Sequence, residues 1–90
     1  MTKSDELFNA LRETTRDTGF AFMRIELQVA NTMLNITLHD ADATRVDRRR
    51  VRAIEARDEV ARHADDVWFT EAQRAELRDG LARLDARLKE

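Results

Sequence analysis

The chain has 90 residues, enough for one domain and too few for two. It has no cysteine, no proline and only two glycines, so disulfides and thiolate sites are excluded and little interrupts a helix. A charged fraction of 38% with a net charge of only −2 favours long helices with ion-paired faces. We therefore expect one all-α domain over residues 1–90, an antiparallel bundle of three to four helices or an array of helical hairpins.

The first expected helix covers about residues 4–18 and has a short apolar face. Gly19 follows a threonine-rich stretch and could end this helix, which would leave residues 1–19 as a separate N-terminal helix. The alternative is one continuous helix, because a series from Leu7 to Val29 keeps alternating steps of three and four across the glycine. The sequence does not decide between these two interpretations.

Residues 20–38 carry two offset apolar series with helical spacing. One series is Phe22, Ile25, Val29, Met33 and Ile36, and the other is Met23, Leu27, Ala30, Leu34 and Leu38. Together they predict a helix with a wide apolar arc that needs cover from more than one side. A β-hairpin is the competing interpretation, but an isolated two-stranded hairpin is marginal and nothing else in the sequence offers a third strand.

Residues 39–44 read as a loop, and Asp40, Asp42 and Thr44 are candidate N-caps for a third helix over about residues 43–66. Three consecutive apolar residues, 67–69, follow this helix. The last expected helix covers residues 70–88, where Thr70 and Gln73 form a capping box and leucines repeat at helical spacing. Gly80 stands within the leucine series and would let another helix approach closely.

No residue pattern points to catalysis, and we expect a non-enzyme that needs no cofactor. The single serine lies near the chain start, and neither lysine is placed where burial would activate it. Glu59, His63 and Asp66 share one helical face with metal-ligand chemistry, but a solvated ion-paired face explains them better, so we expect no metal.

One charge cluster stands out: Arg45, Arg48, Arg49 and Arg52 lie at i, i+3, i+4 and i+7 on one helix face. Cations near a helix N-terminus oppose its dipole, so these arginines need compensating acids or an anion. Structural ion pairing is the first interpretation, and contact with a protein partner is the second. Phosphate binding is the third and would make the chain a nucleic-acid-binding accessory protein.

Residues 43–88 loosely resemble small bacterial helical proteins of uncharacterised function. The resemblance rests on Arg48 to Arg52, Trp68-Phe69, Thr70-Glu71, Glu76-Leu77, Leu81 and Leu84. The helical hairpin is also distantly similar to one tetratricopeptide-type unit, although the 34-residue repeat of that family does not recur here. The second resemblance implies a protein-binding scaffold.

These observations favour a helix-to-helix interaction or oligomerisation module, with a homodimer or another helical protein as partner. The apolar arc is the expected interface, represented by Phe22, Met23, Leu27, Met33 and Leu34. No segment approaches the ~18 apolar residues that a membrane span requires. The start of the chain has no apolar signal-peptide core, so the cytoplasm is the expected compartment.

Overall fold

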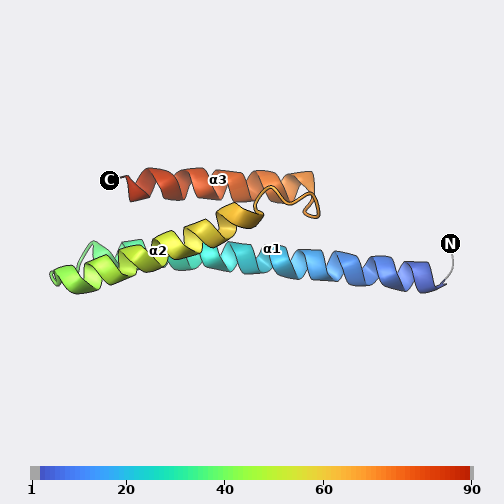
Figure 1. Cartoon of the computed structure of the whole chain (residues 1–90), viewed down its shortest axis with the longest axis horizontal. Coiled ribbons are helices and arrows are strands. Elements are labelled where there is room, and N and C mark those ends of the chain that lie inside the picture. The colour runs from blue at the N-terminus through green and yellow to red at the C-terminus, as the bar shows by residue number, and fades with distance from the viewer. Residues whose placement is uncertain (1–2, 90) are drawn as a thin grey trace.

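The computed structural model is a three-helix array with the helices in antiparallel succession (Figure 1). The structure describes residues 3–89, apart from the side chains of residues 3–5 and 8. Helix α1 covers Lys3–Thr37, α2 covers Ala43–His63 and α3 covers Glu71–Leu88, with no strand within the described range. The molecule is elongated, with principal extents of 61 × 19 × 16 Å. The all-α prediction is confirmed, and so is the helical prediction for residues 20–38, except that the helix ends at Thr37.

Helix α1 runs without interruption through Gly19, which settles the alternative that the sequence left open. Gly19 does not adopt the positive φ of a helix-ending glycine. A Cβ atom placed there would lie 3.8 Å from the ring of Phe69, an ordinary van der Waals distance. The aromatic ring therefore covers the backbone at the one weak point of the helix. Helix α1 is 35 residues long, about 50 Å, whereas α2 has 21 residues and a length of about 30 Å.

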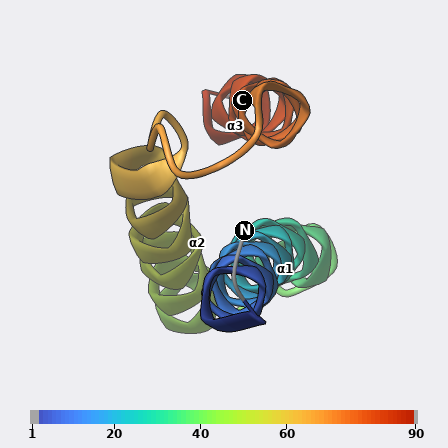
Figure 2. The same ribbon diagram turned by 90° about the vertical axis from the view of Figure 1, so that its right-hand side faces the viewer.

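Helices α1 and α2 lie close together, and α3 lies across from them both (Figure 2). The buried residues of α2 are Ala53, Ala56 and Val60, which are small and let the α1 backbone approach. Ala30 on α1 is also fully buried. Helix α2 therefore covers only one side of α1.

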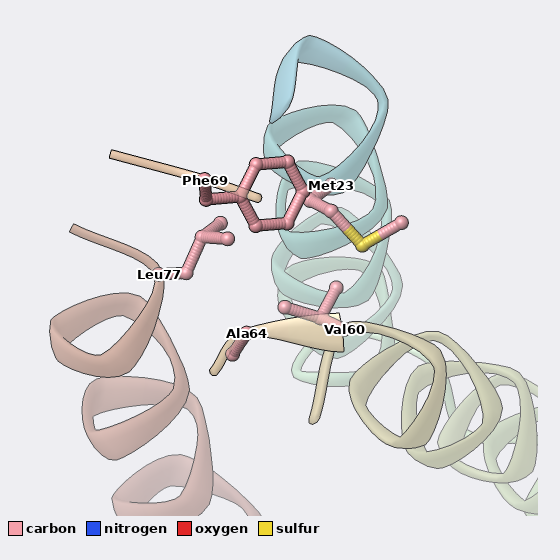
Figure 3. Packing of buried hydrophobic residues seen from close by; sticks show 5 residues of the cluster. All are labelled: Met23, Val60, Ala64, Phe69 and Leu77. Carbon is pink, nitrogen blue, oxygen red and sulfur yellow. The ribbon is translucent and has the colours of Figure 1, made fainter. Parts of the chain in front are cut away.

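Two apolar clusters join the three helices. The first contains Met23, Val60, Ala64, Phe69 and Leu77 and lies beneath the connection between α2 and α3 (Figure 3). The second contains Ala30, Leu34, Ala53, Ala56 and Leu84. Phe69 packs edge-on against Phe20 with ring centroids 6.3 Å apart. It is the last of the three consecutive apolar residues, 67–69. Its neighbours Val67 and Trp68 are exposed.

Helix α3 is held to the others by apolar and polar contacts. Gly80 makes room for Leu27, since a Cβ atom at that position would lie 2.7 Å from the Leu27 side chain. Arg57 on α2 donates two hydrogen bonds to Asp85, at 2.7 and 3.1 Å, and this guanidinium lowers the pKa of the Asp85 carboxyl. Arg87 donates to the side-chain oxygens of Asn31 and Asn35 on α1, at 2.6 Å each.

The caps of α2 and α3 follow the sequence signals. Asp42 is the N-cap of α2, and its side chain accepts hydrogen bonds from the backbone nitrogens of Thr44 and Arg45. Thr70 and Gln73 form the predicted capping box at the start of α3. Helix α2 ends at His63, three residues earlier than expected. The Asp66 carboxylate accepts from the Trp68 backbone nitrogen at 2.9 Å, which stabilises the turn between the helices.

Candidate interaction surface

The two apolar series of residues 20–38 have different environments in the folded chain. The series of Met23, Ala30 and Leu34 points into the clusters between the helices, and Leu27 packs against both of them. The other series remains largely outside: Phe22 is 49% exposed, Ile25 is 54% exposed, and Ile36 is also exposed. The hairpin therefore covers only one half of the wide apolar arc.

The five interface residues predicted from the sequence are divided by this arrangement. Met23 and Leu34 are each only 6% exposed and belong to the core of this chain. Leu27 is half-buried beside Gly80, and Met33 is half-buried against the second cluster. Of the five, only Phe22 is classed as exposed, with about half of its surface accessible (49%). The core positions could not be separated from the surface positions by spacing, because both series have the helical period.

The outward side of α1 forms a long uncharged face, which we call the exposed stripe. Its members recur at intervals of three or four: Leu7, Leu11, Thr14, Thr18, Phe22, Ile25, Val29, Thr32 and Ile36. All are exposed except Val29, which is half-buried. The spacing averages about 3.6 residues, so the stripe follows the axis of a straight helix rather than winding around it. In a chain that is 38% charged, a face of this length without one charged member is unusual.

Leu7 and Leu11 lay outside the predicted interface, whereas Ile25, Val29 and Ile36 belonged to the predicted apolar arc but not to its five representative residues. The signal that could have found them is the absence of charge along the stripe, rather than its hydrophobicity alone.

Two of the three threonines of the exposed stripe have satisfied hydroxyl donors. Thr14 Oγ1 donates to the Ala10 carbonyl oxygen at 2.9 Å, and Thr18 Oγ1 donates to the Thr14 carbonyl oxygen at 2.8 Å. Hydrogen bonds of this i−4 type use the polar hydrogen within the helix itself. Covering these threonines with a partner would therefore leave no hydroxyl hydrogen unpaired.

The first part of α1 projects beyond the other two helices (Figure 1). We call residues 3–16 the overhang. Every described side chain from Glu6 to Thr15 is exposed, including Leu7 and Leu11 at 67% and 66%. An isolated helical segment of about 12–15 residues is marginal in water, even with favourable composition. The overhang therefore gains most from an apolar partner along its stripe.

An open groove lies beside the exposed stripe, between α1 and α2. It is lined by Phe22, Glu26, Arg52, Glu55, Asp58, Glu59 and Arg62. Four of these side chains are acidic and two are basic, so the groove has a net negative charge. Arg62 forms an ion pair with Glu59, and His63 Nε2 lies 3.5 Å from Glu59 Oε1. The groove is thus an acidic border along the second half of the stripe.

The predicted anion-binding arginines are divided between ion pairing and the surface. Arg45 donates to both carboxylate oxygens of Asp40, at 3.0 and 3.1 Å, and Arg49 donates to the same carboxylate at 2.6 Å. The Asp40 side chain is only 10% exposed. Its hydrogen bonds with Arg45 hold the pKa of that carboxyl well below its usual range. Arg48 and Arg52 are exposed. Asp40 and the capping Asp42 therefore compensate the cations at the start of α2.

The Asp40 contact leads to a pH prediction. Because folding lowers the pKa of Asp40, its contribution to stability is complete above the unfolded value of about 4 and is lost as the pH falls below it. Asp40→Asn is expected to lower the urea midpoint at pH 7, and the difference from the parent chain should shrink below pH 4. Asp47→Asn, which changes an exposed carboxylate on α2, is the control. An Asp40→Asn deficit that stays constant down to pH 2 would contradict the ion-pair account.

Glu59, His63 and Asp66, which were considered for metal binding, form local ion pairs and hydrogen bonds instead. Glu59 pairs with Arg62 and His63, while Asp66 accepts a backbone hydrogen bond in the turn after α2. Within residues 3–89, no group of three His, Asp or Glu side chains is arranged to hold a metal ion. The same part of the chain contains no helix with the length and apolar character of a membrane span.

Comparison with protein-family models, curated proteins and solved structures finds no match to this chain. The functional argument therefore rests on the residues and contacts described above.

Proposed function

We propose that this chain is a non-catalytic interaction module that works by helix-to-helix contact along the exposed stripe of α1. The observation that carries the proposal is the uncharged stripe from Leu7 to Ile36, which continues from the hairpin onto the overhang. Apolar surface of this kind marks an interface in soluble proteins, especially where it is contiguous and bordered by charge. The satisfied hydroxyls of Thr14 and Thr18 and the straight course of the stripe both suit a second helix lying alongside.

The arginine cluster gives less support to nucleic-acid binding. Two of its four members, Arg45 and Arg49, are already hydrogen-bonded to Asp40. Phosphate would have to compete with a carboxylate that is held in place by two guanidinium groups. Only Arg48 and Arg52 would remain for direct contact, and two phosphate contacts give weak binding at physiological salt.

The proposal is tested by dye binding and hydrogen exchange. At low protein concentration the stripe should bind a hydrophobic fluorescent dye, and Ile25→Asp should reduce the signal. Val67→Asp is the matched control, because Val67 is 89% exposed but lies outside the stripe. Amides 6–15 should exchange fast when α1 is uncovered and slow down when the stripe is engaged, at high protein concentration or with a partner.

Absence of dye binding at every concentration, together with fast exchange of amides 6–15 under all conditions, would contradict the proposal. Equal loss of dye signal in Ile25→Asp and Val67→Asp would show that the dye-binding surface is not the exposed stripe.

A further inference from the structure

We infer that the occupant of the exposed stripe is a second copy of α1 in antiparallel orientation, with a two-fold axis between Ala21 and Phe22; this inference rests on the proposed function. A two-fold interface uses the same patch on both copies, so the patch must be complementary to itself. The stripe meets this condition in its spacing, its side-chain sizes and its length.

The spacing is symmetric about the midpoint of the stripe. If Leu7 lies opposite Ile36 of the other copy, each remaining member also meets a member: Leu11 faces Thr32, Thr14 faces Val29, and Thr18 faces Ile25. Phe22 lies beside the two-fold axis and approaches its own counterpart. No member of the stripe is left opposite a charged position.

Side-chain size favours antiparallel over parallel pairing. In the antiparallel register every threonine lies opposite an aliphatic side chain, so each layer contains at least one large apolar group. A parallel pair in register would put Thr14, Thr18 and Thr32 each against itself. Three layers of threonine alone bury little apolar surface, and they would interrupt the contact in three places.

The length of the overhang agrees with the same arrangement. The overhang adds about 20 Å to one end of α1, and α2 covers the other end (Figure 1). Antiparallel pairing lays each overhang along the second half of the other α1, next to the groove between α1 and α2. Both copies of α2 then lie on one side of the α1 pair, end to end. Each overhang is thus covered by the half of the other α1 that packs on α2.

The area of the stripe is that of a weak, concentration-dependent dimer. The stripe extends over about 44 Å, and a helix has a diameter of about 10–12 Å, so one contact face covers about 450 Å² in projection. Two such faces give about 900 Å², close to the ~1,000 Å² below which an interface is weak or transient, so association should depend on protein concentration.

The test is cross-linking of single-cysteine variants, which the chain permits because it has no native cysteine. Ala10 and Ala21 are exposed alanines on the same edge of the stripe, about three turns apart. A short bis-maleimide should join two copies of Ala21→Cys, because both lie beside the two-fold axis. It should not join Ala10→Cys, whose two copies would be about 34 Å apart. Ala82→Cys on exposed α3 measures random collision.

Light scattering on the unmodified chain accompanies the cross-linking and should show a concentration-dependent dimer. Equal cross-linking of Ala10→Cys and Ala21→Cys would indicate parallel pairing and overturn the inference, but it would leave the interaction function standing. A monomer at all concentrations, with no cross-linking above the Ala82→Cys level, would also overturn it. The proposed function would fail as well only if the stripe bound no dye and amides 6–15 exchanged fast under all conditions.

Discussion

Met23→Asp is expected to unfold the chain, whereas Phe22→Asp, the substitution next to it, should leave the fold intact and abolish association. Met23 lies in the first apolar cluster with 6% of its surface exposed, and no basic side chain belongs to that cluster. An unpaired carboxylate there costs about 4 kcal/mol or more. A domain of this size has a total stability of about 4–13 kcal/mol, so most of it would be lost.

Phe22→Asp removes no member of either apolar cluster, because Phe22 lies on the other apolar series and is 49% exposed. Its cost in monomer stability should stay within about 1 kcal/mol, mainly from helix propensity. Loss of apolar contact alone should weaken association by about 10–10²-fold, since dimer formation can bury only the exposed half of each ring, worth about half of the 1.5–3 kcal/mol of a fully buried one. The two new carboxylates at the contact should weaken association further.

Circular dichroism and sedimentation separate the two effects in one pair of samples. Met23→Asp should lose helical signal at 25 °C, and Phe22→Asp should keep it while sedimenting as a monomer. A folded Met23→Asp chain would show that the first cluster does not hold the hairpin together. An associating Phe22→Asp chain would show that the contact lies away from the stripe.

The sequence predicted the local structure well where the signals were local. The Thr70–Gln73 capping box and the leucines of α3 depend on neighbours within a few residues, and both were found as expected. Gly19 was different. A glycine inside a helix costs only about 1 kcal/mol relative to alanine, and a single tertiary contact can outweigh that. Here the contact is the ring of Phe69, fifty residues away, which no periodicity argument identifies.

The inward and outward faces of α1 could not be predicted for a related reason. Both apolar series satisfy the helical period, so spacing alone cannot say which one meets α2. The choice depends on the shape of the other helices: the alanines of α2 accept Ala30 and Leu34, and Gly80 of α3 accepts Leu27.

The ion-pair partner of Arg45 and Arg49, which is Asp40, also could not be predicted from the sequence. Asp40 lies in the loop before α2, five residues from Arg45 and nine from Arg49. Pairing rules for helices consider separations of three or four. The loop between α1 and α2 brings Asp40 back over the first turns of α2, so the compensation arises from the turn geometry.

Leu84→Ala is expected to be the most damaging truncation in the second cluster, with a loss of about 2–5 kcal/mol in the free energy of unfolding. Leu84 is fully buried, and its cluster partners include Ala30, Ala53 and Ala56. Alanine side chains cannot move into the space that a leucine leaves, because they have no rotamers to change. The cavity would therefore remain, and the cost should lie toward the upper end of this range.

Urea unfolding measures this loss, followed both by circular dichroism and by the fluorescence of Trp68, the only tryptophan of the chain. Leu38→Ala is the control, since Leu38 is 73% exposed and its truncation should change stability by less than about 0.5 kcal/mol. Coincident transitions in the two signals would show that α3 unfolds together with the α1–α2 hairpin. If instead Leu84→Ala unfolded α3 alone, the Trp68 transition would come first, and α1 and α2 would form the stable unit that carries the exposed stripe.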